Sequence, residues 1–477
     1  MGNIRTDENI ITSRSKFTGR KVIFSDAAEI NAENVIEELK KAMDVHSVNS
    51  AQIDYLYRYY KGDQPVLNRE KTVREEICND VVENRANEIV SFKVGYLMGE
   101  PVQYVSNGED QSSLENLKKL NRFMKAAKKK MSDRQLAEWF YICGTAYRLA
   151  LPTSDPKKPI SITTLDPRYA FVVYRNNVEK TPLMGVTYVV KEGNKKEYGV
   201  YTKDHFYSIV DEKVVSEYGI ITGGIPIIEY PANNARLGSF EIVLSLLDAI
   251  DTVESNRVDG IEQFVQAIMV FKGVDVDSDQ WNQIKEEGAV LLPAGADAKY
   301  LCQELNQTQT QTLIDHMYQA VLTICGMPSQ GNGQTSDSSN NGAVILRNGW
   351  QSAEARAKDT EIMFESSETD FLELVLNYTG ILSSLEIDVA DIEIRFTRRN
   401  YENITEKTNV LKTMLSTDKI HPKLAFTHCG LFSDPDLAFN ESQKYYLDTL
   451  NQEEGDLDGK PTGQFVKSYF RTDPEQI

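Results

Sequence analysis

The chain of 477 residues carries a formal net charge of −19, and 41% of its residues are hydrophobic and 26% charged. These values fit a folded protein of two to four domains, exclude a largely disordered chain, and argue against a tight, sequence-specific DNA binder, which normally needs a basic surface. The sequence has no apolar run near the roughly 18 residues of a membrane span and no signal-peptide core, so we expect a cytosolic protein with no membrane partner.

The N-terminal third is predicted to be mostly helical. Residues 1–45 are expected to form a loosely ordered arm that leads into a short helix, ENVIEELKKAM, and a helix-rich block with four tyrosines follows. Gly99 and Pro101 end a further helix, after which a strand is expected. The basic run from Lys125 to Lys130 lies in a helical context. We interpret it as a solvated helix face, with phosphate contact as the alternative.

Strands and then a long helix are predicted in the middle of the chain. Residues 146–218 are rich in aromatic and β-branched side chains and are punctuated by prolines, which is typical of an antiparallel sheet of several hairpins. The chain then turns at Asn233 and Asn234, and Ser239 is a candidate cap for an amphipathic helix that extends to about Phe271. Unbroken, that helix would be roughly 45 Å long. It is either a core helix of a large enzyme or a helix packed beside copies of itself in a ring, and its apolar face includes Val243, Leu246, Ile250 and Val253.

Helices also dominate the last third. Residues 273–305 are expected to hold a short helix and the strand GAVLL, and a second amphipathic helix ends at Gly326 and Pro328. The stretch SQGNGQTSDSSNNG has no apolar side chain, so its composition indicates a flexible loop, with a plain linker as the alternative. A third helix from about Ala343 to Tyr378, kinked near Gly349, the strand ADIEIRF, further helical segments and an acidic tail complete the chain.

No motif predicts a cofactor, a metal or an enzyme. Five scattered cysteines and five scattered histidines contain no zinc-binding spacing. One segment imitates a calcium loop, but Gln280 stands where the sharp turn needs Gly, so we expect a capped short helix there; its candidate ligands are Asp275, Asp277, Asp279 and Glu286. GKPTG lacks the first glycine and the Ser or Thr of a phosphate-binding loop, and no other catalytic motif is present.

Several segments resemble, in their order and spacing, the portal proteins of tailed double-stranded DNA bacteriophages of the long non-contractile tail type. They include NEIVSFKVGYLMGEPV, LDPRYAFVVY, NNARLGSFEIVLSLLDAIDTVES, NNGAVILRNGW and FTRRNYENITE followed by DPDLAFNE. The resemblance covers roughly Ile53 to Asp448. It implies an α+β subunit with a long α-helical stem, a β-rich wing, a small α/β clip and an α-helical crown.

The resemblance also implies how these parts are distributed along the sequence. The expected parts are an N-terminal arm (1–45), the wing (46–235), the first stem helix (236–272), the clip (273–305), the second stem helix (306–328), the tunnel loop (329–342), a long kinked helix with a wing strand (343–395), and the crown with a C-terminal tail (396–477).

As a portal protein, the chain would form a ring of about twelve subunits at the unique capsid vertex of the virion, assembled in the host cytoplasm. The ring would be the channel for genome packaging and ejection. Its implied partners are the DNA, the terminase packaging motor, a head-completion or adaptor protein, and the major capsid and scaffolding proteins. The alternative is a non-portal oligomeric virion scaffold or adaptor protein, whereas a packaging ATPase would need the missing phosphate-binding loop.

Two sets of residues follow as candidate sites. The apolar stem face Val243, Leu246, Ile250 and Val253 is expected to be buried between subunits, because so long a helix has little of its own chain to cover it. The tunnel loop has no basic residue, so it would touch DNA without holding it, through Gln330, Asn332, Gln334, Ser338 and Asn340.

Overall fold

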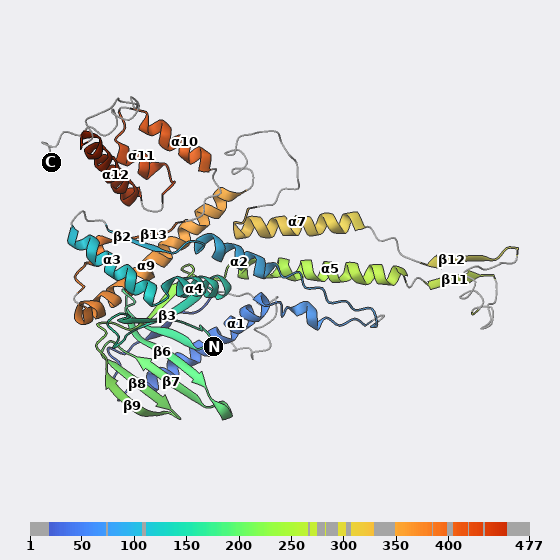
Figure 1. Ribbon diagram of the computed structural model, residues 1–477. Helices are drawn as coiled ribbons and strands as arrows, with labels where there is room; N and C mark the ends of the chain where they lie inside the picture. Colours follow the sequence, from blue (N-terminus) through green and yellow to red (C-terminus); the bar gives the residue numbers. More distant parts are fainter. Residues whose placement is uncertain are drawn as a thin grey trace.

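The computed structural model shows an α+β subunit with a central body, a sheet on one side, a projecting helix pair and a separate group of C-terminal helices (Figure 1). This confirms the fold class expected from the sequence. The structure describes residues 19–72, 75–106, 111–265, 268–273, 282, 294–301, 307–328, 349–383, 385–397, 404–417, 419–432 and 435–455.

A six-stranded sheet carries most of the strands, in the order β1-β5-β6-β7-β8-β9. All neighbours are antiparallel except β1 and β5, which are parallel. The predicted hairpins are therefore confirmed for residues 170–219, whereas residues 145–165 lie in a separate sheet with residues 227–231. Asp211 and Glu212 connect β8 to β9 with φ values of 48° and 60°, as a tight two-residue hairpin turn requires. The strands are β1 (Ile23–Ser25), β5 (Ala170–Arg175), β6 (Pro182–Val190), β7 (Lys196–Tyr201), β8 (His205–Val210) and β9 (Lys213–Gly219).

Helix α1 (Val35–Tyr60) packs against this sheet and is longer than the sequence suggested. Its 26 residues continue without a break through the tyrosine cluster, because Val35, Leu39 and Ala42 are buried on the sheet while the later turns reach the body. The segment before α1 contains β1, so residues 23–25 belong to the sheet and not to a loosely ordered arm.

The body surrounds a second sheet, β10-β3-β4, and a short β13-β2 pair. One large apolar cluster joins these strands to the helices around them. The body consists of α2 (Arg85–Leu97), β2 (Gln103–Ser106), α3 (Gln111–Ala126), α4 (Lys129–Cys143), β3 (Thr145–Pro152), β4 (Ile160–Leu165), β10 (Ile227–Pro231), α9 (Trp350–Ser383) and β13 (Ile392–Arg395). Gly349, with φ of 76°, lies just before the first residue of α9. Residues 343–348 lie outside the described residues, so the kink expected near Gly349 stays a prediction.

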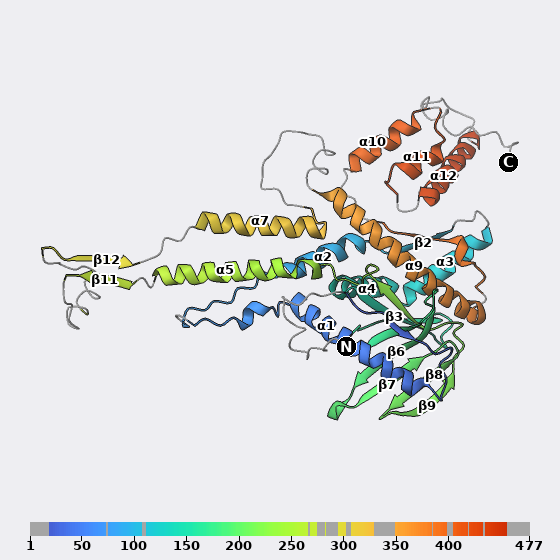
Figure 2. The same ribbon diagram turned by 180° about the vertical axis from the view of Figure 1, so that it is seen from behind.

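Two antiparallel helices, α5 (Leu244–Val265) and α7 (Gln307–Cys325), project from the body side by side (Figures 1 and 2). The hairpin of β11 (Ile268–Lys272) and β12 (Asp297–Leu301) lies at their far end. The long helix was predicted to reach Phe271, but it ends at Val265 because residues 268–272 pair with β12. Its 22 residues span about 33 Å.

The C-terminal helices α10 (Ile404–Leu415), α11 (Pro422–His428) and α12 (Pro435–Gly455) form a group beside the N-terminal end of α9 and the β13-β2 pair (Figure 1). Phe426 stacks on Phe432 and lies edge-on to Phe439, which makes a small aromatic core for the group. Of the described helices, none combines the length and apolar character needed to cross a membrane.

Candidate functional site, the projecting helix pair

The base of the helix pair is held by a close crossing of backbones. Gly144, with φ of 83°, follows α4, and an added Cβ there would lie 2.0 Å from the carbonyl oxygen of Arg236. Ser239 does not cap the helix as predicted, because its hydroxyl donates a hydrogen bond to the carbonyl oxygen of Tyr141 at 2.8 Å. A short 3₁₀ turn, η4 (Glu241–Val243), leads into α5 instead.

Glu241 anchors this turn to the N-terminal segment. Its Oε1 atom pairs with Nη2 of Arg20 at 2.5 Å, and its Oε2 atom accepts the backbone N–H of Gly238 at 2.8 Å. Burial raises the pKa of Glu241, although the charge of Arg20 acts in the opposite direction. The start of α5 is therefore fixed to the body by a buried ion pair as well as by apolar contacts.

The predicted apolar face of α5 is covered mainly by its own chain. Val243 and Ile250 are 0% and 1% exposed and belong to the core of the body. Leu246 and Val253 are half-buried and pack against the same core. The expectation that this face is buried between subunits is therefore wrong for Val243 and Ile250, because the apolar core of the subunit itself already covers them.

The exposed apolar side chains of α5 lie further from the body. Val258 and Ile261 are 37% and 48% exposed. They are three residues apart and therefore share one face of the helix. On α7, Leu313 is 49% exposed. The sequence pattern of α5 could not distinguish the covered from the uncovered part of its apolar stripe.

An irregular segment, residues 77–84, runs along α5 and is hydrogen-bonded to every fourth residue of the helix. The backbone N–H groups of Asn79, Val81 and Glu83 donate to side chains of α5 at 2.7, 2.9 and 2.9 Å. The acceptors are, in the same order, Asp259 Oδ1, Ser255 Oγ and Asp251 Oδ1. We call these six residues the docking ladder.

The spacing of the docking ladder has a simple geometric cause. Four residues of an α-helix rise about 6 Å, and two residues of nearly extended chain cover about 6.6 Å. Acceptors at every fourth helix position therefore meet donors at every second position of the segment. The three acceptor residues are buried although they lie on a projecting helix, because the segment covers them.

The two ends of the docking ladder differ in how their carboxylates are paired. At its outer end Arg69 Nη2 and Lys71 Nζ lie 2.5 and 2.9 Å from Asp259 Oδ2. Burial opposes ionisation of Asp259, but hydrogen bonds from Lys71, Asn79 and Arg69 hold its pKa well below the ordinary value. At the inner end, burial raises the pKa of Asp251 to about 7, and the nearby carboxylate of Asp248 adds to this.

Asp248 continues this polar side of α5 toward the body. Its Oδ1 atom accepts a hydrogen bond from the hydroxyl of Tyr59 at 2.9 Å, while burial raises its pKa to about 6. Asp248, Asp251, Ser255 and Asp259 thus form a polar stripe that attaches α5 to α1 and to residues 77–84. Their spacing was visible in the sequence, but nothing there identified the segment that they bind.

A buried charge network fixes α9 to the same body. Two cations and two anions meet there, namely Lys129 and Asp133 of α4, Arg148 of β3 and Glu368 of α9. Tyr104 and Tyr230 donate hydrogen bonds to Glu368 at 2.5 and 2.8 Å. Lys129 is 4% exposed, so the interpretation of the run 125–130 as a solvated face is wrong for this residue.

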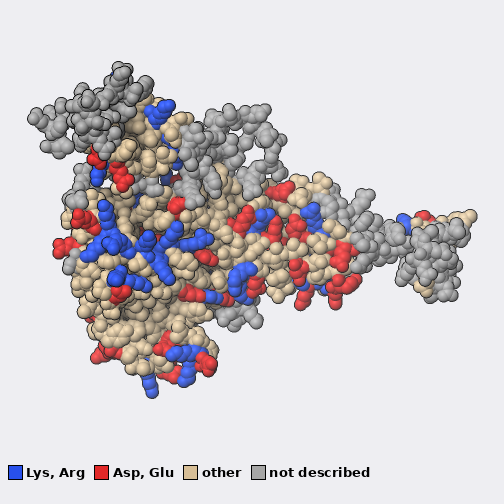
Figure 3. Space-filling view, in the orientation of Figure 1, with Lys and Arg blue, Asp and Glu red and all other residues tan. Residues whose placement is uncertain are grey.

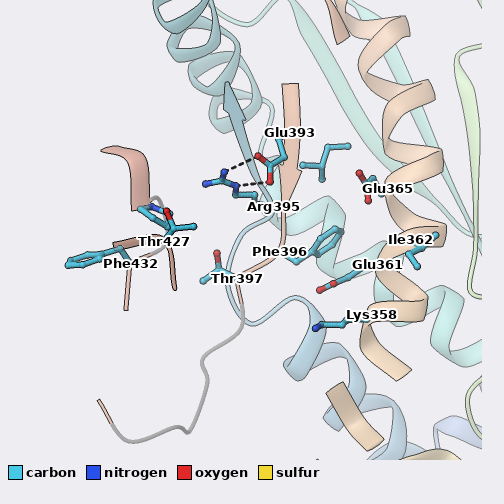
Figure 4. A pocket seen from close by; sticks show the side chains of 12 residues that line it. Lys358, Glu361, Ile362, Glu365, Glu393, Arg395, Phe396, Thr397, Thr427 and Phe432 are labelled. Atoms are coloured by element: carbon cyan, nitrogen blue, oxygen red, sulfur yellow. Dashed lines mark hydrogen bonds and ion pairs between the residues drawn. The ribbon is translucent and has the colours of Figure 1, made fainter. Parts of the chain in front are cut away.

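A groove of about 690 Å³ separates α9 and β13 from the C-terminal helices (Figure 4). Glu393 and Arg395 lie two residues apart on β13, so they face the same side, and they form a two-bond ion pair at 2.8 and 2.9 Å. The lining contains no His and no Cys. Among the described residues, no group of His, Cys, Asp and Glu is arranged to hold a metal ion.

Two of the predicted sites lie outside the described residues. These are the tunnel-loop residues Gln330, Asn332, Gln334, Ser338 and Asn340, and the calcium-like set Asp275, Asp277, Asp279 and Glu286. The strand GAVLL predicted for residues 288–292 also lies outside them.

Comparison with known proteins agrees with the sequence resemblance. The family model described as "Phage portal protein, SPP1 Gp6-like" matches residues 39–455. The portal protein of Bacillus phage SPP1 is 22% identical over 292 residues, which are 54% of this chain and 55% of that protein. The match thus spans about half the length of this relative.

Two solved structures of gene transfer agent particles show weaker similarity. A chain of the neck of an empty particle has a TM-score of 0.46 at 13% identity, with 72% of this chain and 90% of that chain covered. A chain of the native virion has a TM-score of 0.44 at 13% identity, with 76% and 88% covered.

Proposed function

Because the chain belongs to the SPP1 Gp6-like family of phage portal proteins, we propose that about twelve copies form a ring at one capsid vertex. The ring is the channel through which the genome is packaged and ejected. The family match carries this proposal, since residues 39–455 include the helix pair, the sheet and the C-terminal helices. In this assignment the protein is a structural component of the virion, has no enzymatic activity, and serves a phage of the long non-contractile tail type.

The parts of the subunit have distinct roles in the proposed ring. Helices α5 and α7 form the stem, and the β11–β12 hairpin belongs to the clip, where the packaging motor and a head-completion or adaptor protein bind. The six-stranded sheet with α1 is the main part of the wing and faces the capsid and scaffolding proteins. The C-terminal helices form the crown, and residues 329–342 form the tunnel loop toward the DNA.

The distribution of apolar surface supports contact between neighbouring stems. Val258 and Ile261 share a face of α5 and are partly exposed, although Val243 and Ile250 near the base of the helix are buried. Apolar side chains on a projecting helix gain stability when a neighbouring copy covers them, at about 25 cal/mol for each Å² removed from water. A closed ring supplies such a neighbour to every subunit.

The negative net charge of the subunit supports the proposal that the channel does not hold DNA tightly. Each subunit contributes a net charge of −19, so the ring as a whole repels phosphate. The tunnel loop contains no charged group except Asp337, and its amide and hydroxyl groups can contact the DNA backbone without fixing it. DNA therefore slides past the loop in either direction.

Mass measurement and electron microscopy of the purified full chain test this proposal. A ring of about twelve subunits with an open axial channel is expected. A particle without a channel would favour the scaffold or adaptor function instead. A chain that stays monomeric at high concentration, alone and with scaffolding protein present, would contradict the ring.

A further inference from the structure

A concentrated basic surface crosses the body on α3 and the start of α4. Figure 3 shows Lys and Arg side chains gathered where Figure 1 places α3, on a subunit whose net charge is strongly negative. We call this surface the basic patch. Its six exposed cations are Lys118, Arg122, Lys125, Lys128, Lys130 and Arg134.

Helix geometry places these cations in two neighbouring rows. Lys118, Arg122 and Lys125 are four and three residues apart, so they form one stripe along α3. The stripe is about 10 Å long, which matches about three base-pair steps of DNA at 3.4 Å. Lys128, with φ of 59°, turns the chain into α4, where Lys130 and Arg134 are again four residues apart.

The charges of the basic patch are not neutralised by the subunit. None of the six cations forms an ion pair with another described residue. Glu115 is the one carboxylate in residues 112–132, and the next, Asp133, is buried and bound to Lys129 and Arg148. Beside the six-stranded sheet, by contrast, two exposed lysines do have partners, namely Glu197 for Lys191 and Asp211 for Lys195.

The composition of the basic patch indicates the kind of partner. The apolar residues of α3, such as Leu117, Leu120 and Phe123, are buried, and Met131 is the large apolar side chain exposed beside the cations, at 56%. Protein interfaces usually have aromatic or aliphatic anchors at their centre and are poor in lysine. Sequence-independent binding of phosphates needs only clustered Lys and Arg.

We propose that the basic patch binds the phosphate backbone of double-stranded DNA, independently of base sequence and separately from the channel. The patch belongs to the body and not to the helix pair or the tunnel loop, so it is a second DNA contact of the subunit. It counteracts the net acidity of the chain on one face only. Because its contacts are charge pairs, its affinity falls steeply as salt is added.

Fluorescence anisotropy with a labelled duplex of about 30 base pairs and mixed sequence tests the proposal on the full-length protein. The binding constant is measured between about 50 and 200 mM salt. The quadruple variant Lys118→Gln, Arg122→Gln, Lys125→Gln, Lys128→Gln should bind about tenfold or more weakly at the lowest salt. The slope of its logarithmic binding constant against logarithmic salt concentration should be shallower by up to about 3.6, since each of the four lost phosphate contacts removes about 0.9.

A matched variant controls for net charge. The variant Lys40→Gln, Lys191→Gln, Lys195→Gln, Lys213→Gln removes the same number of exposed cations from α1 and the six-stranded sheet, and it should bind within about twofold of the wild type. Equal loss of affinity in both variants would overturn the proposal. So would an absence of binding by the wild type, or equally strong competition by polyglutamate, which would identify an acidic protein as the partner.

The mass of the assembly is measured on the same samples. If the ring forms but does not bind the duplex, DNA binding by the basic patch is refuted and the portal function is unaffected. If the wild type forms no ring, the portal function is contradicted, whatever its DNA affinity.

Discussion

Arg148 and Glu368 are 220 positions apart in the sequence, yet their fully buried side chains form an ion pair with 2.8 Å between Nη1 and Oε2. Lys129 Nζ lies 2.8 Å from the other oxygen of Glu368. Burial alone would raise the pKa of Glu368, but these two cations and the hydrogen bonds to the carboxylate hold it below its ordinary value. One carboxylate on α9 thus pairs with two cations from α4 and β3, and Asp133 of α4 supplies the second negative charge.

Glu368→Gln should lower the free energy of unfolding by about 3–5 kcal/mol, because it leaves one buried positive charge without a counter-ion. Denaturant unfolding of the wild type and the variant measures the difference. Glu365→Gln is the matched control, since Glu365 is exposed on the same helix, and it should change stability by less than about 0.5 kcal/mol. Equal effects of the two substitutions on the free energy of unfolding would show that the buried charge network does not stabilise the fold more than a surface carboxylate does.

The raised pKa of Asp251 predicts a pH-dependent stability difference. Because its pKa is about 7 in the folded protein and lower when unfolded, the folded state binds the proton more tightly, and stability is lost as pH rises toward 7. Asp251→Asn keeps an oxygen for the N–H of Glu83 but cannot ionise. The variant should therefore gain stability over the wild type between about pH 4 and 7, at up to about 1.4 kcal/mol per pH unit.

Thermal unfolding at several pH values measures this difference. Above about pH 8 it should be constant, because Asp251 is then ionised in both states of the wild type. A difference that does not change between pH 5 and 7 would contradict the shifted pKa.

Gly144→Ala should destabilise the base of the helix pair. Its Cβ would lie 2.0 Å from the backbone of Arg236, which cannot move aside, and its φ of 83° is also unfavourable for Ala. Gly193→Ala is the control, since Gly193 has φ of 75° but nothing within 4 Å of the added Cβ. The control should cost about 1 kcal/mol of backbone strain, and Gly144→Ala clearly more. Similar melting temperatures for the two variants would contradict the close approach of the backbones at Gly144 and Arg236.

Val258→Asp with Ile261→Asp should prevent ring formation while each subunit stays folded, because both side chains are partly exposed in the single chain. Size-exclusion chromatography with light scattering should show monomers. Val178→Asp, at a position 99% exposed on a turn of the sheet, should leave assembly unchanged. Ile250→Asp should unfold the subunit instead, since Ile250 is in the core. If the double variant formed normal rings, Val258 and Ile261 would not lie in the contact between neighbouring stems.

Deletion of residues 331–340 should leave the ring assembled, because the segment has no apolar side chain to contribute to packing. It should impair packaging of DNA or its retention in particles. Particle yield and the length of the enclosed genome are the measurements. Normal packaging and retention of full-length genomes would reduce the segment to a linker.

The local sequence pattern predicted a helix or strand well where the spacing of its apolar residues fits only one of the two. The end of α7 at Cys325 is confirmed, because Gly326 and Pro328 follow it, and the predicted strand ADIEIRF is confirmed for residues 392–395. The end of α5 was placed too late. Residues 268–271 are all apolar and fit either a helix or a strand, and the choice depends on pairing with residues 298–301, which local sequence cannot show.

The candidate site was less predictable because its contacts join distant segments. Local sequence gives no sign of what Asp251, Ser255 and Asp259 bind, and only the position of residues 77–84 shows that they are buried acceptors. Lys129 lies in a basic run, and Glu368, more than 200 residues later, shows that it is buried. For the same reason the pattern could not separate the covered from the uncovered part of the apolar stripe on α5.

The docking ladder also determines how the helix pair responds to mechanical load. Its three hydrogen bonds lie in a row along α5, so a pull along the helix axis stretches all of them together, in shear. A pull perpendicular to the axis opens them one after another, starting at one end. Asp259, with its two additional cationic partners, reinforces the outer end, where such peeling would begin. The attachment is therefore stiff against axial force and resists peeling most strongly at the end nearest the β11–β12 hairpin.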